Sequence, residues 1–207
     1  LWNHGYAYAC TCSRRDIADA AAAPQEGETP PSGPDGVIYP GTCRPDSPPD
    51  GPMPTDTAIR LSLDAVARKT GSARTGSDIF SFTETGAGPN GETGLIEFTM
   101  QDAIDTIGDI VLARRDMGTS YHLSVVLDDA AQGITHVVRG QDLFEATKIH
   151  VILQRVLKLP TPAYHHHRLI RDETGKRLAK RDDARAIATY RAEGLGPQDV
   201  RRRVGLA

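Results

Sequence analysis

The chain has 207 residues, of which 39% are hydrophobic and 25% charged, and its formal net charge at pH 7 is −3. This length suits one sizeable hydrophobic core or two small ones. The sequence has no run of eighteen apolar residues, which argues against a membrane-spanning helix, and its first six residues do not resemble a signal peptide. We therefore expect a cytoplasmic protein.

Charge is unevenly distributed along the chain. Residues 168–203 contain eleven Lys or Arg and six Asp or Glu, so the remainder is acidic. A basic C-terminal third predicts a polyanionic partner, either nucleotide phosphates or a nucleic-acid backbone. A solvated charged helix explains the same counts equally well.

The N-terminal quarter has two parts. Residues 1–23 predict a short turn with two cysteines, followed by a helix over 16–23 that ends at Pro24. Residues 24–54 contain ten of the fourteen prolines and five of the glycines, with almost no aliphatic side chains. Such a composition cannot form a packed core and predicts a long flexible segment, fixed in its middle at residues 39–43.

Strand-like segments begin after Thr55. They are short, apolar or alternating, and bounded by polar turns, while the Gly/Ser/Thr-rich stretch 69–94 between two of them predicts a loop. The predicted strands cover residues 58–63, 94–99, 110–114, 121–127 and 134–138.

A helix is predicted over residues 142–157. Asp142 and Glu145 have capping-box spacing, an apolar face repeats at helical intervals, and Pro160 follows. A strand, a glycine, a capped helix and another apolar segment indicate an α/β unit, whose ligands bind at the carboxyl ends of the strands. Arg139 and Gly140 are expected at such an end.

The three cysteines, Cys10, Cys12 and Cys43, lie near the two ends of the flexible segment. They supply three of the four ligands of a tetrahedral zinc site, and the fourth would be His4, Asp16, Tyr39 or water. Three unrelated free thiols in a reducing compartment are the alternative.

Residues 175–181 form a glycine followed by a dense basic loop, Gly-Lys-Arg-Leu-Ala-Lys-Arg. Such a loop can neutralise the charge that builds on a leaving pyrophosphate. From composition alone, a solvated basic turn is the favoured interpretation.

A further set of polar residues surrounds Arg139. Its guanidinium could hold a carboxylate bidentately, with Tyr121 donating a hydrogen bond beside it. The pair Asp128–Asp129 could bind a metal, although a turn or helix start explains it better. The run His165–His167 is typical of surface decoration, with one ring facing a nucleotide as the alternative.

Together these segments resemble the glutamyl-tRNA synthetase branch of the class I aminoacyl-tRNA synthetases. The motifs that carry the resemblance follow one another in the family's order. They are residues 108–116, 121–130, 133–140, Asp142-Leu143, Thr147, Pro162-x-Tyr164-x-His166, and the loop Arg177-Leu178-Ala179-Lys180-Arg181, which resembles the family's KMSKS signature.

Within that branch, the chain is more similar to the short glutamyl-Q tRNA(Asp) synthetases, which lack an anticodon-binding domain. It stops soon after the KMSKS-like loop, and Cys10-x-Cys12 with Tyr39-x-x-x-Cys43 resembles their zinc site. The resemblance implies an enzyme that activates L-glutamate with ATP and Mg²⁺ and transfers it to queuosine of tRNA(Asp). It also implies bound Zn²⁺, and we expect a monomer.

By the same resemblance, Tyr121 and Arg139 would bind glutamate, and Lys180 would be the catalytic residue that contacts the ATP phosphates. The loop residues Arg177, Leu178, Ala179, Lys180 and Arg181 would bind ATP, although the family's first lysine is Arg177 here and its serine is Ala179. The metal ligands would be Cys10, Cys12, Tyr39 and Cys43, with 26 residues between Cys12 and Tyr39.

The expected fold is α/β, the C-terminal part of a class I Rossmann-like nucleotide-binding fold with a zinc-binding insertion. Residues 1–54 would form the insertion with its Pro/Gly-rich segment, and residues 55–207 the second half of the catalytic domain. The HIGH-motif half is missing and the first methionine is Met53, so we expect a fragment that is inactive alone and exposes apolar strand edges.

Two rival interpretations remain open. The chain could be a fragment of a glutamyl-tRNA synthetase that charges tRNA(Glu). It could also be a non-catalytic, zinc-stapled module that binds tRNA through the basic region 168–203.

Overall fold

The structure is a computed structural model that describes residues 1–22, 30–70, 79–115, 118–171, 175 and 186–206. It is a mixed α/β chain that divides into two compact units, Leu1–His166 and His167–Ala207. No helix among the described residues is long and apolar enough to cross a membrane.

The first sheet of the larger unit has the strand order β1-β4-β7-β8. Its strands are β1 (Ala7–Cys10), β4 (Ala58–Leu61), β7 (Ile110–Arg114) and β8 (Gly118–Thr119), and all neighbours are antiparallel. β1 and β4 pair with Tyr8 opposite Arg60, so the cysteine-containing N-terminus is part of the same sheet as the segments after residue 55.

The second sheet has the order β6-β5-β10-β9. β5 (Ile79–Glu84) and β6 (Gly94–Thr99) are antiparallel, whereas β10 (Ala163–His167) runs parallel to β5. β9 (His136–Gly140) is at the edge. Arg139 and Gly140 are therefore the last residues of a strand, as the sequence predicted.

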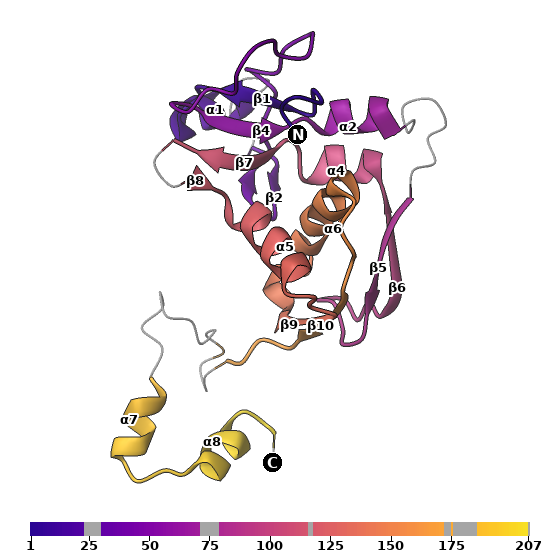
Figure 1. The fold of residues 1–207 in the computed structure, drawn as a ribbon. Helices are drawn as coiled ribbons and strands as arrows, with labels where there is room; N and C mark the ends of the chain where they lie inside the picture. Colours follow the sequence, from indigo (N-terminus) through magenta and orange to yellow (C-terminus); the bar gives the residue numbers. More distant parts are fainter. Residues whose placement is uncertain (23–29, 71–78, 116–117, 172–174, 176–185, 207) are drawn as a thin grey trace. The chain divides into compact units, whose positions relative to one another are not determined.

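Helices fill the space between these sheets (Figure 1). α6 (Ala146–Leu157) packs against β5 and against α5 (Tyr121–Ala131), and α2 (Leu63–Thr70) packs against α4 (Met100–Thr106). One continuous core of buried side chains, including Leu61, Phe80 and Ile152, spans both sheets and these helices.

The remaining elements are short. α1 (Arg14–Ala22) confirms the helix predicted near the N-terminus, and β2 (Ser32–Gly33) and β3 (Gly36–Val37) form a hairpin within the Pro/Gly-rich segment. A 3-10 turn (Gln141–Leu143) links β9 to α6. The smaller unit contains α7 (Ile187–Ala192) and α8 (Pro197–Arg203).

The strand predicted over residues 121–127 is wrong, because these residues begin the helix α5. Ser120 caps this helix by accepting a hydrogen bond from the N–H of Leu123 at 3.3 Å. The buried residues His122 and Val126 are four apart, which is helical spacing. Short apolar runs fit both structures, and the cap decides between them.

Two other predictions are also wrong. Residues 69–94 were expected to be loop, yet they contain β5, whose buried side chains alternate as Phe80, Phe82 and Glu84. The predicted capping box of α6 is absent, because that helix begins at Ala146 after a 3-10 turn and its cap residue Glu145 makes no side-chain capping bond.

A buried carboxylate connects four segments of the larger unit. Asp109 accepts hydrogen bonds at Oδ2 from the hydroxyl of Tyr8 (2.5 Å) and Nε of Arg44 (2.8 Å), and at Oδ1 from the N–H of Leu63 (2.9 Å). Its carbonyl oxygen accepts from Nη1 of Arg60 at 3.0 Å. Strands β1 and β4, the start of α2 and the Pro/Gly-rich segment therefore meet at one residue.

We predict that Asp109→Asn lowers the free energy of unfolding by about 1 to 3 kcal/mol, because the amide weakens the buried hydrogen bonds from Tyr8 and Leu63 and leaves Arg44 with Asp64 as its remaining counter-charge. Urea unfolding followed by circular dichroism measures this change. The control is Asp105→Asn, an exposed aspartate of α4 that accepts a hydrogen bond from Gln101, and it should alter stability by less than about 0.5 kcal/mol. Equal midpoints for the two variants contradict the prediction.

Candidate functional site

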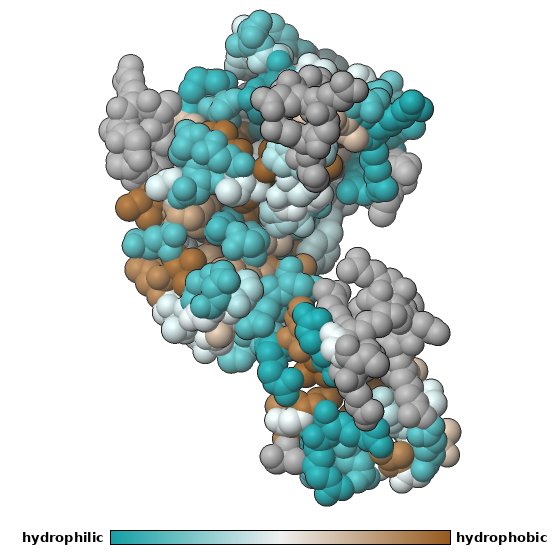
Figure 2. All heavy atoms as spheres, turned by 180° about the vertical axis from the view of Figure 1, so that it is seen from behind, coloured by the Kyte–Doolittle hydropathy of each residue, from teal (hydrophilic) through white to brown (hydrophobic). Residues whose placement is uncertain are grey.

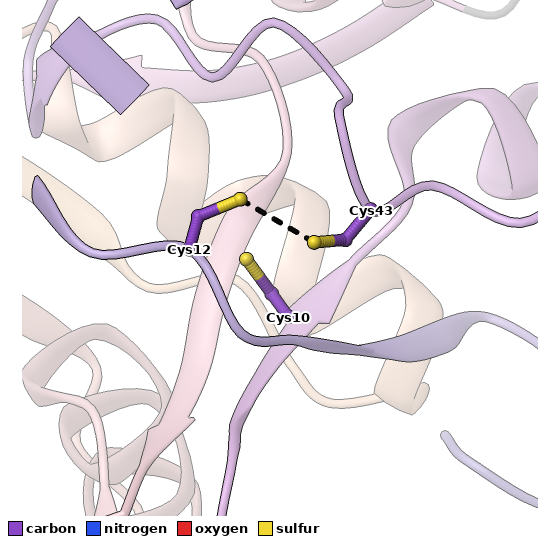
Figure 3. Close-up of side chains that lie close together, drawn as sticks. All are labelled: Cys10, Cys12 and Cys43. Carbon is purple, nitrogen blue, oxygen red and sulfur yellow. Dashed lines mark hydrogen bonds between the residues drawn. The ribbon is translucent and has the colours of Figure 1, made fainter. Parts of the chain in front are cut away.

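The three cysteines converge on one point. Cys10 ends β1, Cys12 precedes α1 and Cys43 comes from the Pro/Gly-rich segment, and their sulfur atoms all lie within 4.8 Å of one another. Their side chains point inward toward a common centre (Figure 3). Sulfur atoms bound to one zinc at about 2.3 Å lie about 3.8 Å apart in a tetrahedron. The cluster is therefore compatible with zinc.

Of the side chains considered for the fourth position, Tyr39 reaches the cysteines. Its hydroxyl oxygen lies 3.5 Å from the sulfur atoms of both Cys10 and Cys12, and it accepts a hydrogen bond from the backbone N–H of Cys43 at 2.7 Å. Asp16 instead accepts from the N–H of Ser13 at 2.7 Å. The guanidinium of Arg60 covers the Tyr39 ring at 3.9 Å.

The thiols differ in acidity. Burial raises the pKa of Cys12 to about 11. Burial also opposes ionisation of Cys43, but hydrogen bonds with Tyr39 and with the backbone of Thr11 outweigh it and lower the pKa of Cys43 to about 6. One of the three sulfur atoms is thus readily deprotonated near neutral pH, as a metal ligand must be.

A second polar cluster surrounds Arg139 at the end of β9. Its Nε donates to Nε2 of His166 (3.1 Å), Nη1 to Nδ1 of His150 (3.2 Å) and Nη2 to the hydroxyl of Thr147 (2.6 Å). The guanidinium also lies over the ring of Tyr164, 5.2 Å from its centroid. Each of these neighbours is an uncharged acceptor or an aromatic face.

His166 is held in turn by Glu84. Nδ1 of His166 lies 2.5 Å from Oε2 of Glu84, whose Oε1 accepts from the backbone N–H groups of His166 and Gly86. Burial opposes ionisation of Glu84, but these hydrogen bonds hold its pKa below the ordinary value. Because Arg139 only donates, Nε2 of His166 must accept, and the ring proton lies on Nδ1.

The hydrogen bonds of Arg139 also determine which ring nitrogen carries the proton in His150 and in His122. Nδ1 of His150 accepts from Arg139, so its Nε2–H donates to Nδ1 of His122 at 3.0 Å. His122 then carries its proton on Nε2, which lies 3.6 Å from Oδ1 of Asp35. Burial and the charge of Arg139 lower the pKa of His150 to about 3.

Arg139 forms no direct ion pair among the described residues, and Asp129 acts on its charge only from beyond ion-pair distance. No carboxylate of the described residues lies within ion-pair distance of its guanidinium, and burial lowers the pKa of Arg139 from its ordinary value. Beside it, Tyr121 begins α5, is 58% exposed and interacts with the guanidinium through its hydroxyl. A half-buried cation next to an accessible phenol is a site for an anionic ligand.

The structure places the other sequence-predicted residues as follows. Asp128 and Asp129 lie in the last turns of α5 and join no metal-binding cluster among the described residues. The interpretation of residues 165–167 as surface decoration is wrong for His166, which is 1% exposed. Lys180 and the rest of the KMSKS-like loop, residues 177–181, lie outside the described residues.

Sequence reasoning missed Glu84, His122 and His150. The alternation in residues 79–84 is visible in the sequence, and with Phe80 and Phe82 facing the core it puts Glu84 on the buried face. His150 lies on the apolar face of α6, where a lone histidine gives no signal of its partners. Only the packing of α5 on α6 brings His122 to it.

Part of the larger unit exposes apolar side chains. Val138 of the edge strand β9 is 67% exposed, and Leu127 and Ile134 nearby in the chain are also exposed. Figure 2, which views the molecule from behind, shows that brown apolar atoms lie among teal polar ones on the surface of this unit. The exposed apolar edge predicted from the sequence is confirmed for β9.

Residues 88–207 match the family model of the class I tRNA synthetase (E and Q) catalytic domain. The glutamyl-Q tRNA(Asp) synthetase of Rhodobacter capsulatus is 59% identical over all 207 residues, which span 69% of its length. The chain belongs to this family of class I tRNA synthetases. The synthetase of the same name from Geobacter sulfurreducens is 38% identical over 90% of the chain, which spans 50% of that relative.

The fold agrees with the family. The glutamate-tRNA synthetase structure from Elizabethkingia anophelis is similar to 86% of this synthetase chain with a TM-score of 0.57 and 20% identity, and the match covers 33% of that protein. The predicted class I α/β fold is thereby confirmed. The chain spans about half to two thirds of the length of the relatives it matches.

Acid should weaken this synthetase fold through its buried histidines. The pKa of His150 is about 3 in the folded chain and 6.5 ordinarily. Its contribution to the free energy of unfolding is therefore fully present above pH 6.5 and is lost as the pH falls toward 3. We predict that His150→Gln removes about 2 to 3 kcal/mol of the stability lost between pH 6.5 and 4.5. Urea unfolding at both pH values measures the difference.

His166 has a pKa lowered by burial, so part of the loss should remain in His150→Gln. Identical losses in the variant and the unmodified chain contradict the assignment of the effect to His150.

Proposed function

We propose that the protein to which this chain belongs activates L-glutamate with ATP and transfers it to queuosine of tRNA(Asp). The observation that carries this proposal is the cation of Arg139, which has no direct ion pair among the described residues, beside the exposed Tyr121. A substrate carboxylate would supply the missing negative charge. The relatives' name, glutamyl-Q tRNA(Asp) synthetase, supports the choice of glutamate and of the acceptor tRNA.

In this proposal, Arg139 binds a carboxylate of glutamate and Tyr121 hydrogen bonds beside it. Lys180, with Arg177, Leu178, Ala179 and Arg181 around it, contacts the phosphates of ATP, which binds with Mg²⁺. Closure of a basic loop over the phosphates excludes water and stabilises the charge that develops on pyrophosphate. The physical role of Lys180 is that of a point charge, and that of Arg139 a planar fork.

The proposed zinc ligands are Cys10, Cys12, Tyr39 and Cys43. The convergence of three sulfur atoms and one phenol oxygen supports this set. Bound Zn²⁺ would be structural, because four protein ligands leave no open position for a substrate. It would fasten the Pro/Gly-rich segment to β1, in addition to the contact between Tyr39 and Cys10 and the hydrogen bonds that Arg44 and Tyr8 both make with Asp109.

We predict that the native protein, purified from its source, transfers radiolabelled glutamate to tRNA(Asp) that carries queuosine. It should label neither tRNA(Asp) lacking queuosine nor tRNA(Glu), because the modified base provides the acceptor. Labelling of tRNA(Glu) would instead indicate a glutamyl-tRNA synthetase. The intact mass of the same preparation, compared with that of 207 residues, tells whether a further half of the catalytic domain is present.

Lys180→Ala provides the matched test of catalysis. It should reduce glutamate-dependent ATP–pyrophosphate exchange by about a hundredfold or more, since the lysine stabilises charge on the leaving group. Lys69→Ala, which removes an exposed lysine beside Tyr6, should have no effect. If Lys180→Ala only weakens salt-dependent tRNA binding and the unmodified protein shows no exchange, a non-catalytic tRNA-binding module is the correct function.

The zinc site yields its own prediction. Tyr39→Phe should lower zinc affinity by about tenfold or more, because even residues that only support metal ligands commonly contribute that much. Competition with a chromogenic chelator measures the affinity, and metal analysis gives the stoichiometry. Tyr6→Phe is the control, since Tyr6 contacts Lys69 rather than the cysteines. Unchanged affinity and stoichiometry in Tyr39→Phe remove this tyrosine from the site.

A further inference from the structure

We propose that His150 and His166 are positioning residues for Arg139. As neutral hydrogen-bond acceptors they fix the plane of the guanidinium and keep its charge available for a ligand carboxylate. This inference rests on the proposed role of Arg139 in binding glutamate, and it adds the residues that prepare Arg139 for that role.

The count of N–H groups supports this role. A guanidinium has five, and three of those of Arg139 are directed at His166, His150 and Thr147. One N–H remains on Nη1 and one on Nη2, and the Tyr121 hydroxyl also hydrogen bonds with Arg139. At least one N–H of the guanidinium is therefore left to donate to a ligand carboxylate, beside the Tyr121 hydroxyl.

The charges support it as well. Glu84 lies behind His166, which separates this carboxylate from Arg139 while bonding to both. If a carboxylate accepted directly from Arg139, it would neutralise the cation and compete with the ligand. A neutral imidazole orients the guanidinium but neither neutralises its charge nor competes with the ligand.

His150 is also held by a hydrogen bond at its second ring nitrogen. Its Nε2–H bonds His122, which directly follows Tyr121 in α5, and His122 lies 3.6 Å from Asp35 in the β2–β3 hairpin. Asp35 also lines a cleft of about 820 Å³ next to Cys10, Cys12 and Tyr39. One line of polar contacts therefore runs from the hairpin near the cysteine cluster to Arg139.

The first test is the protonation of the rings in the unmodified chain at pH 7. Long-range ¹H–¹⁵N NMR spectra distinguish the two nitrogens of each imidazole. The proposal requires neutral rings, with the proton on Nδ1 of His166 and on Nε2 of His150. A protonated ring or the opposite tautomer at either position overturns it, whether or not the chain binds glutamate.

The second test replaces His150. His150→Leu should shift the Nη–H resonance of Arg139, because Nη1 donates to His150, whereas His150→Gln, which can still accept and donate, should retain it. Titration with L-glutamate should show a Kd about tenfold higher for His150→Leu and within about threefold for His150→Gln. His136→Leu, at an exposed histidine of the same strand as Arg139, should match the unmodified chain.

The outcomes separate the two proposals. An unchanged Arg139 resonance in folded His150→Leu overturns the positioning role. If the unmodified chain binds no L-glutamate, the proposed glutamate site is overturned, and the ring tautomers with the Arg139 resonance still decide whether His150 and His166 position the guanidinium. If His150→Leu does not fold, the tautomers and His150→Gln decide.

Discussion

The buried carboxylate of Asp109 is the constraint on which the larger unit depends. It accepts from the Tyr8 hydroxyl, the Arg44 guanidinium and the first N–H of α2. Gly108, with φ +70°, makes the turn that leads from α4 into β7 and thereby places this carboxylate. Because Arg44 directly follows Cys43, the position of the third cysteine depends on the same interaction.

The cysteine cluster and the Arg139 cluster suit ligands of opposite charge. The cysteine cluster collects groups that become negative and therefore suit a cation. The Arg139 cluster surrounds a cation with neutral acceptors and therefore suits an anion. The Arg139 arrangement raises the free energy of the chain without its ligand, since a charge that could be paired internally is left for an external partner.

The sequence predicted the strands at residues 94–99 and 110–114 and one over 58–63 that ends at Leu61 in the structure, because strong local patterns carry that information. It failed at residues 121–127, where an apolar run fits a strand or a helix and the Ser120 cap decides for the helix. It failed again at β5, because the Gly, Ser and Thr content of residues 69–94 was weighted above the alternation of Phe80 and Phe82. The composition of a segment is therefore a weaker guide to its secondary structure than the period at which its apolar residues repeat.

By itself the sequence determined the family and the cysteine pattern and gave the candidates for substrate binding, since these depend on residue type and order along the chain. Only the tertiary structure decided what supports them. Glu84, His150 and His166 come from β5, α6 and β10, and they meet because α6 packs against the sheet in which β5 and β10 are neighbours. Side-chain hydrogen bonds act over about 3 Å, so no pattern along the chain can specify such partners until packing has brought them into reach.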